Sequence, residues 1–455
     1  MQKLREDHLL FIFYGIMQFW RTLMYKYSKF NYYLFENERI IIYNFLSSKM
    51  LCVFKSKDKI IFQYLLQLYS DGTADTIPCN ELIESGIVVL STVNEIELLD
   101  NAYENFIDND TFHITILVNE KCNFKCVYCY EENAGIEITN DIIDGIIFFV
   151  CDMIKNHNYH HLHISWFGGE PLLSMPAISS VMHKIKNELK NIEITSSMTT
   201  NGYLLYGTTL STLLTLGINS FQITLDGNME SHNATRMLKD GSKTFDKIWE
   251  NIITLCEYNE PFELLIRSNY NETNYDNIYK LIDMVKDLND NRIKMHFHPI
   301  INMPGSGINS DTCEYCDDYF SDIVITEYTR YCLRNNIVSD SWGMKAVPFC
   351  GNCYAANPNY FAIDPSGVLR KCTVSIKESY NDVGRILGPD KYYINDEKNQ
   401  KWVINYSVES EQCKACEMLP LCYGPGCPEG MLRNGVRRCR KNTYFLDQIL
   451  TETAK

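Results

Sequence analysis

Three cysteines in one short run, Cys122, Cys126 and Cys129, have the spacing in this chain that most specifically predicts chemistry. The run reads Cys-Asn-Phe-Lys-Cys-Val-Tyr-Cys, follows an apolar stretch and places Tyr128 directly before its third cysteine. Three thiolates can hold three irons of a [4Fe–4S] cluster, whereas full ligation takes four cysteines. The fourth iron would then be open to a small molecule. A zinc loop is the alternative, but zinc favours CxxC pairs in sets of four.

Four further polar or glycine-rich segments follow the cysteine run, each directly after an apolar run of strand length. They are Gly168-Gly169-Glu170-Pro171, Asn201-Gly202, Asp226-Gly227 and Arg267-Ser268-Asn269. Glycines let a backbone approach a ligand closely, and a carboxylate can bind an ammonium group. Each segment alone is a weak signal, since Asp-Gly by itself is more often a hairpin turn.

The cysteine run and these segments, in this order, closely resemble the radical S-adenosylmethionine (SAM) enzymes. The resemblance implies that the three cysteines hold a [4Fe–4S] cluster whose open iron binds SAM. In such enzymes one electron from the cluster breaks SAM into methionine and a 5′-deoxyadenosyl radical, which abstracts hydrogen from a substrate. The protein positions and shields this chemistry, and the sequence identifies no general base. The residues implied to bind SAM are Tyr128, Gly168, Gly169, Glu170, Asn201, Asp226, Arg267 and Asn269.

Strand-length and helix-length segments alternate through the middle of the chain. The predicted strands cover residues 113–118, 162–166, 192–196, 220–225, 262–266 and 294–299, and the predicted helices cover residues 140–156, 177–189, 208–216, 244–258 and 275–288. Such alternation predicts an α/β fold with parallel strands and right-handed crossovers. Six units are typical of a partial (β/α)6 barrel of TIM type, which the resemblance also implies. The polar segments follow strands, where α/β folds carry their sites.

Eight cysteines in the last quarter of the chain form a second constellation. They are Cys350, Cys353, Cys372, Cys413, Cys416, Cys422, Cys427 and Cys439. Their spacing resembles the SPASM extension of radical SAM peptide maturases, although the interval from Cys422 to Cys427 is one residue longer than usual. Eight thiolates suffice for two fully ligated [4Fe–4S] clusters.

The SPASM resemblance implies an outer auxiliary cluster and an inner one. The outer cluster would be held by Cys413, Cys416, Cys422 and Cys439, and the inner one by Cys372 and Cys427 with Cys350, Cys353 or both. If only one of that pair is a ligand, the inner cluster keeps an open iron. A zinc ribbon remains an alternative for the paired cysteines, and Cys313 and Cys316 are not assigned.

The N-terminal part predicts a separate unit. Predicted strands at 32–35, 39–43 and 50–54, helices at 58–69 and 80–86 and a wing from residue 87 resemble a winged-helix leader-peptide recognition domain. Such domains bind an extended peptide at a sheet edge; a purely structural cap is the alternative. Residues 1–23 are expected to be a helical extension, or to precede a natural start at Met24. Residues 100–110, rich in Asp and Asn, predict a linker.

These segments divide the chain into four predicted regions. They are an N-terminal extension and recognition domain (1–101), a radical SAM partial barrel (111–302), a bridging region (303–349) and a SPASM domain (350–455).

Composition favours a cytoplasmic enzyme. The 455 residues carry a net charge of −15 without a basic stripe, which argues against a nucleic-acid partner. The 18 cysteines of so long a chain do not indicate a secreted disulfide scaffold. The apolar run at 9–20 is too short to span a bilayer, so no membrane association is expected.

The resemblance implies that the substrate is a ribosomally made precursor peptide, and the expected product is a thioether between a cysteine sulfur and a peptide carbon. Carbon–carbon or ether crosslinking and formylglycine-type sulfatase maturation are the enzymatic alternatives. An iron–sulfur or zinc binding module is the non-enzymatic one. An electron donor such as flavodoxin or ferredoxin is the second expected partner.

Overall fold

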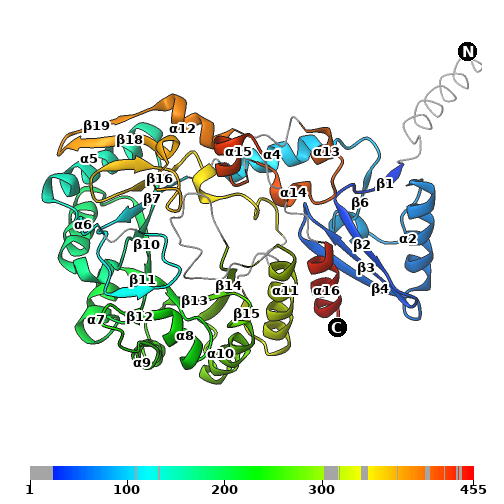
Figure 1. Ribbon diagram of the computed structural model, residues 1–455. Helices are drawn as coiled ribbons and strands as arrows, with labels where there is room; N and C mark the ends of the chain where they lie inside the picture. The colour runs from blue at the N-terminus through cyan, green and yellow to red at the C-terminus, as the bar shows by residue number, and fades with distance from the viewer. Residues whose placement is uncertain are drawn as a thin grey trace, which may run out of the picture.

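The computed structural model describes residues 24–107, 110–131, 134–301, 316, 318–339, 347–376, 378–404, 410–424, 426–436, 439 and 443–455. The expectations for residues 1–23 and for Cys313 lie outside these ranges. The largest element is an 11-stranded mixed sheet with the order β15-β14-β13-β11-β10-β9-β7-β16-β17-β18-β19 (Figure 1). None of the described helices is long and apolar enough to cross a membrane.

Six neighbouring strands of this sheet run parallel, as predicted. They are β7 (Thr111–Leu117), β9 (His161–Phe167), β10 (Glu193–Thr200), β11 (Ile218–Thr224), β13 (Glu263–Tyr270) and β14 (Ile293–Pro299). The connecting helices are α5 (Asn140–His157), α6 (Met175–Glu188), α7 (Gly207–Thr215), α9 (Phe245–Cys256) and α10 (Tyr275–Leu288). They lie along the outside of the strands in Figure 1. The α/β class with parallel strands is therefore confirmed.

The two faces of the barrel strands differ in polarity. On β9, Leu162, Ile164 and Trp166 are fully buried in the core shared with the helices. The alternate residues His163 and Ser165 point to the inner face, since side chains alternate along a strand. TIM barrels fill their interior with branched apolar residues, whereas the polar inner face here borders a cavity.

Four strands that the sequence analysis did not predict extend the sheet beyond β7. They are β16 (Tyr360–Ile363), β17 (Val368–Arg370), β18 (Asp382–Gly388) and β19 (Lys391–Ile394). Strand β16 pairs in parallel with β7, and the other three pair antiparallel in succession. The cysteine-rich region is thereby joined to the barrel through backbone hydrogen bonds.

Helix α5 packs closely on this added sheet at Gly145. A Cβ atom at Gly145 would lie 2.2 Å from Cγ2 of Ile386 and 2.5 Å from the carbonyl oxygen of Gly388. We expect Gly145→Ala to destabilise the protein by about 1–3 kcal/mol, because the backbone of β18 must shift to admit a methyl group. Thermal unfolding would show a lower Tm. Gly388→Ala is the matched control, since its Cβ would meet no atom within 4 Å; equal Tm values for the two variants would contradict the contact.

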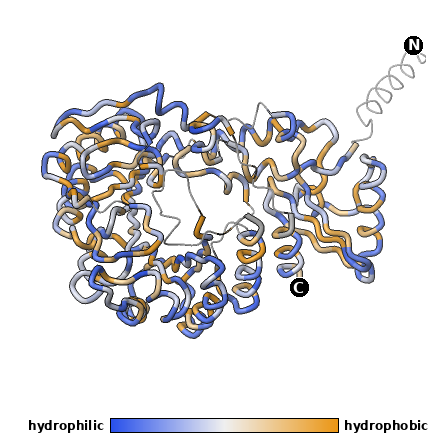
Figure 2. Tube along the Cα trace, in the orientation of Figure 1, coloured by the Kyte–Doolittle hydropathy of each residue, from blue (hydrophilic) through white to orange (hydrophobic). Residues whose placement is uncertain are grey.

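The N-terminal unit contains two small antiparallel sheets. The first is β2 (Asn31–Phe35), β3 (Arg39–Asn44) and β4 (Lys49–Phe54), and the second is β5 (Thr73–Ala74), β1 (Tyr25–Tyr27) and β6 (Val88–Leu90). Three helices accompany them: α2 (Lys59–Asp71), α3 (Glu81–Glu84) and α4 (Glu95–Ile107). Figure 2 shows the apolar residues of this unit concentrated on the strands β2 to β4.

Helix α4 corrects the linker predicted at residues 100–110. Leu99 is fully buried in an apolar cluster with Phe30, Phe349 and Tyr423. The polar composition of the segment indicated a loop, but one apolar helix face packs between the N-terminal unit and the C-terminal region. Tertiary burial therefore overrode the local signal.

The remaining elements are short or connect these units. They are β8 (Phe124–Cys126), α8 (Met229–Thr235), β12 (Arg236–Leu238), α11 (Asp318–Arg334), β15 (Val338–Ser339), α12 (Asp396–Val403), α13 (Glu411–Lys414), α14 (Leu419–Cys422), α15 (Glu429–Asn434) and α16 (Thr443–Thr453). The C-terminal helix α16 lies between α11 and the sheet β2–β4 (Figure 1). It is held there by Tyr32, whose hydroxyl donates to Asp447 at 2.7 Å, and by an ion pair between Arg334 and Glu452 at 2.6 Å.

Candidate active site

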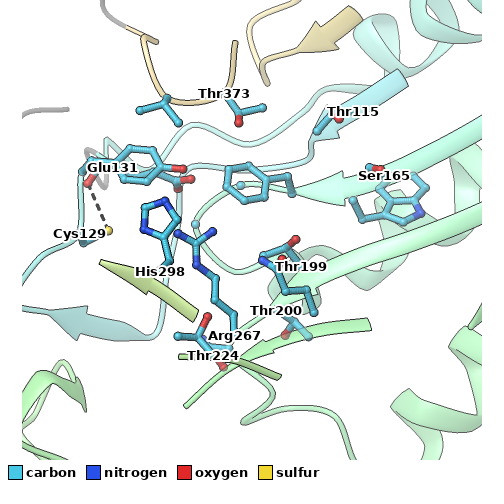
Figure 3. Close-up of a pocket in the computed structure, with 18 of the residues that line it drawn as sticks. Thr115, Cys129, Glu131, Ser165, Thr199, Thr200, Thr224, Arg267, His298 and Thr373 are labelled. Atoms are coloured by element: carbon cyan, nitrogen blue, oxygen red, sulfur yellow. Dashed lines mark hydrogen bonds between the residues drawn. The ribbon is translucent and has the colours of Figure 1, made fainter. Parts of the chain in front are cut away.

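The barrel interior contains a cavity of about 640 Å³ (Figure 3). Its walls are the cysteine run after β7, the inner faces of the parallel strands and residues of the C-terminal region. Of the residues that the sequence analysis assigned to SAM, six line it: Tyr128, Gly168, Gly169, Asn201, Arg267 and Asn269. Glu170 and Asp226 are not among the lining residues.

Cys122, Cys126 and Cys129 all line the cavity. Burial raises the pKa of the Cys122 thiol to about 12. The charge of Glu170 and then those of the neighbouring thiols Cys126 and Cys129 contribute to this increase. Such thiols carry their protons unless a metal is bound, because coordination favours the thiolate. In the described ranges, no three His, Cys, Asp or Glu side chains converge on a point where one ion could bind. Three thiols around one cavity fit the ligand set of a cluster, whose irons each take one of them.

The two glycines of the predicted SAM segment bring two chain segments together. Gly168 has a φ of 121°, and a Cβ there would lie 2.3 Å from the carbonyl oxygen of Asn119. A Cβ at Gly169 would lie 2.4 Å from the carbonyl oxygen of Lys121. The end of β9 therefore packs against the backbone that leads into Cys122. The glycines are needed for this approach, and both also line the cavity.

Glu170 lies at the end of β9, next to the two glycines. Its carboxylate is fully buried and accepts hydrogen bonds from the backbone of Leu172 at 3.0 Å, from Thr200 Oγ1 at 2.7 Å and from the backbone of Asn201 at 2.8 Å. The side chain joins the ends of β9 and β10, and this positions Asn201 at the cavity.

Asp226 is likewise fully buried rather than exposed to the cavity. It accepts hydrogen bonds from the hydroxyl of Tyr128 at 2.5 Å, from Thr235 Oγ1 at 2.9 Å and from the backbone of Asn269 at 3.2 Å. These hydrogen bonds link the cysteine run to the end of β13. Tyr128 also accepts from Asn269 Nδ2 at 3.0 Å.

Arg236 is a lining residue that the sequence analysis missed. It stands opposite Cys126 in the short antiparallel pair of β8 and β12, and its Nη1 donates to the hydroxyl of Tyr128 at 2.8 Å. Burial alone would lower the pKa of Arg236, but Cys126, Tyr128 and Asp226 together raise it. An arginine before two apolar residues is a weak sequence signal, and only the β8–β12 pairing brings it to the cysteines.

Several inner-face residues were also missed or assigned elsewhere. His298 and Thr224 line the cavity beside Arg267 (Figure 3). His163, expected to have a surface or packing role, lines it as well, and its ring nitrogens lie 2.8 Å from Thr195 Oγ1 and 3.0 Å from Ser197 Oγ. The alternation of inward and outward side chains along each strand was the sequence signal that could have identified these residues.

The C-terminal cysteines separate into two neighbourhoods. Cys353 contacts Cys427, which raises the pKa of its thiol together with burial and the charge of Cys372. Tyr354 follows Cys353 in the chain, and Thr373 follows Cys372. Both residues line the cavity, and their hydroxyl groups share a hydrogen bond of 2.6 Å. Three cysteines predicted for the inner cluster therefore lie together beside the cavity.

Cys350 lies in the other neighbourhood. It packs with Cys416 in the apolar cluster of Phe45, and the next residue, Gly351, approaches Cys422. Of the other cysteines in question, Cys413 packs against the cluster of Phe30, Cys439 is exposed, and the thiol of buried Cys316 donates to the carbonyl oxygen of Tyr270 at 3.3 Å.

Comparison with known proteins agrees with this geometry. Residues 116–284 match the Radical SAM superfamily. The radical SAM cyclopropyl synthase TigE of Paramaledivibacter caminithermalis is 23% identical over 78% of this chain and 77% of its own length. A cysteine-type anaerobic sulfatase-maturating enzyme of Clostridium novyi is 23% identical over 74% of this chain and 91% of its own length.

Solved structures share the fold. The structure of anSMEcpe with bound AdoMet and Cp18Cys peptide has a TM-score of 0.56 at 17% identity and covers 76% of this chain and 98% of that one. Streptococcus suis SuiB bound to the precursor peptide SuiA has a TM-score of 0.52 at 15% identity and covers 92% and 99%. Superfamily members use a [4Fe–4S] cluster and SAM. The residues that match the Radical SAM superfamily, 116–284, hold the three cysteines and most of the cavity wall.

Proposed function

We propose that this protein is a radical SAM enzyme that modifies a peptide, with a thioether crosslink in a ribosomally made precursor as the leading product. The observation that carries the proposal is the position of the cavity, which has Cys122, Cys126 and Cys129 on one wall and Tyr354 and Thr373 on another. A substrate in it would lie between a radical source and a second group of cysteines.

The cofactor would supply the radical: SAM, cleaved with one electron from an external donor such as flavodoxin or ferredoxin, provides the group that abstracts hydrogen. The protein's own residues hold and orient. Cys122, Cys126 and Cys129 would ligate the cluster, and the network of Tyr128, Asp226 and Arg236 fixes the loop that carries them.

Thioether formation removes one hydrogen atom, one proton and one electron from the peptide. The proposed site therefore needs an electron acceptor besides the radical source. We propose that Cys353, Cys372 and Cys427 contribute to an inner auxiliary cluster with that role, and that Cys413, Cys416, Cys422 and Cys439 hold an outer one. In support, the first three lie together beside the cavity.

Sulfatase maturation is the second candidate function. The named sulfatase-maturating relative, which this chain matches over 91% of that relative's length, favours it. Mass spectrometry of a modified peptide separates the two outcomes, because a crosslink removes only two hydrogens whereas formylglycine formation from cysteine also exchanges sulfur for oxygen.

We further propose that the N-terminal unit, residues 1–101, binds the leader of the precursor. An aromatic group, here called the aromatic patch, lies where the edge strand β2 meets α2. It consists of Tyr27, Tyr33, Phe35 and Tyr69, whose neighbouring ring centroids are 5.0–6.3 Å apart. Phe35 and Tyr69 are 45% and 56% exposed, which is unusual for such large apolar side chains. An extended peptide added along an edge strand would cover them.

Removing the two exposed rings of the aromatic patch tests this role. We expect Phe35→Ser/Tyr69→Ser to weaken binding of a precursor peptide, taken from a short reading frame beside the gene, by about tenfold or more. Fluorescence anisotropy with a labelled leader measures it. SAM cleavage without peptide should be unchanged, since neither ring touches the cavity.

Ile60→Ser is the matched control, because Ile60 is 76% exposed on the same helix α2 but outside the aromatic patch. Equal binding by the double variant and the control would exclude the patch as the leader site. Deletion of the whole unit is less informative, since Phe30 and Phe45 pack against the C-terminal region.

A further inference from the structure

We propose that Arg267 forms an anion subsite that binds a carboxylate of the substrate, separate from the residues that hold SAM. The ligand class is a carboxylate on a peptide, from an Asp or Glu side chain or a chain end. This inference rests on the proposed function, in which SAM and a peptide share the cavity, and it names a substrate feature that the function alone leaves open.

The cavity is cationic although the whole chain carries a net charge of −15. Among its lining residues, Glu131 is the one carboxyl group, against the two guanidinium groups of Arg236 and Arg267. The two arginines therefore outnumber the one carboxyl group, and a buried guanidinium group requires an anion when water is displaced.

The two arginines are held by different partners, although Tyr128 and Asp226 lie in the electrostatic environment of both. Arg236 stands opposite Cys126, bonds Tyr128 and has Asp226 in its electrostatic environment. If SAM bound the open iron of a cluster on this loop, its carboxylate would lie near the loop, where Arg236 stands opposite Cys126. Arg236 is the cation placed there. SAM carries a single carboxylate, so Arg267 is left for another anion.

Arg267 extends from β13 toward the middle of the cavity, between Thr224 and His298 (Figure 3). Its Nε donates to Asn269 Oδ1 at 2.9 Å, which fixes the stem of the guanidinium group. No described carboxylate forms an ion pair with it. Burial is the largest influence on Arg267 and lowers its pKa, but the group stays charged because an arginine pKa lies far above neutrality.

His298 does not compete for the anion as a second cation. Burial, then the charges of Arg267 and His296, lower the pKa of His298 well below its usual value. Its Nδ1 lies 2.8 Å from the carbonyl oxygen of Pro299, so the neutral ring donates there. The positive charge next to His298 therefore resides on Arg267, and Arg236 is the other guanidinium group that acts on it.

A carboxylate fits this arrangement better than a neutral group. The guanidinium fork donates two parallel hydrogen bonds to a planar carboxylate, and such charge-assisted bonds are stronger than neutral ones. The cavity that contains Arg267 is also lined by Tyr354 and Thr373 of the C-terminal region, so a peptide bound there would share the cavity with the subsite. Arg267 would then align a particular residue with the radical and favour peptides with an acidic residue near the modified position.

Saturation-transfer NMR on the reconstituted protein with SAM bound and the clusters oxidised tests the subsite without turnover. The probes are N-acetyl-aspartic acid amide and N-acetyl-glutamic acid amide, with the matching asparagine and glutamine compounds as neutral isosteres. We expect at least one acidic probe to bind wild type about tenfold or more tightly than its isostere. Arg267→Met should remove the difference, and Arg267→Lys should restore part of it.

The affinity for SAM distinguishes the two sources of a carboxylate. Arg267→Met is expected to bind SAM in equilibrium dialysis nearly as wild type does, whereas Arg236→Met is expected to lose most of that affinity. Loss of SAM binding in Arg267→Met would overturn the proposal by assigning this arginine to SAM. So would equal binding of acidic and neutral probes to wild type, or an acidic preference that persists in Arg267→Met. Failure of any precursor to become modified would count against the proposed function instead.

Discussion

Replacing Cys122, Cys126 and Cys129 together with alanine is expected to abolish formation of 5′-deoxyadenosine by the reduced, reconstituted protein. Iron should fall from about twelve to about eight atoms per chain, because one of the three expected [4Fe–4S] clusters is lost. The physical reason is that these three thiols line one cavity and no other cysteine is among its described lining residues. Anaerobic reconstitution, iron and sulfide analysis and chromatography of the nucleoside products measure both effects.

Cys151→Ala provides the matched control for this variant. Cys151 is a half-buried cysteine on the outer helix α5 and does not line the cavity. Iron content and nucleoside formation should equal those of wild type. If wild type instead bound about four irons together with zinc, the C-terminal cysteines would be a structural zinc site, and the peptide-modifying proposal would lose its electron acceptor.

Asp226→Asn is expected to produce the second large effect, on stability and on SAM affinity together. The carboxylate is fully buried and holds Tyr128, Thr235 and the backbone of Asn269. An amide removes a buried negative charge that acts on Arg236 and weakens the three hydrogen bonds that the carboxylate accepts, which is expected to cost about 1–3 kcal/mol. The loop of Tyr128 and Cys126 should loosen, so the affinity for SAM should fall by about tenfold or more.

Thermal unfolding and equilibrium dialysis with SAM measure these two quantities. Asp246→Asn is the control, because Asp246 is exposed in the first turn of α9 and belongs to neither the cavity nor its network. A Tm and a SAM affinity that both match the control would show that Asp226 contributes nothing to the arrangement of Arg236.

Local pattern in the sequence was sufficient for the barrel and for the cysteine run. Five predicted helices and six predicted strands correspond to α5, α6, α7, α9 and α10 and to the parallel strands of the sheet, because each is long and strongly periodic. The spacing of Cys122, Cys126 and Cys129 is a property of one loop, so it needed no knowledge of distant residues.

Tertiary structure alone decided which side chains meet. The sequence predicts Glu170 and Asp226 as acids at strand ends, but only the structure shows which donors from other segments surround them. Arg236 has no motif, and the pairing of β8 with β12 brings it opposite Cys126. Likewise, Cys350 packs in the cluster of Phe45 whereas Cys353 contacts Cys427. The three-residue spacing of the two cysteines could not predict that they have different neighbours. Contacts between segments far apart in the chain arise from burial and backbone pairing, which leave little trace in local composition.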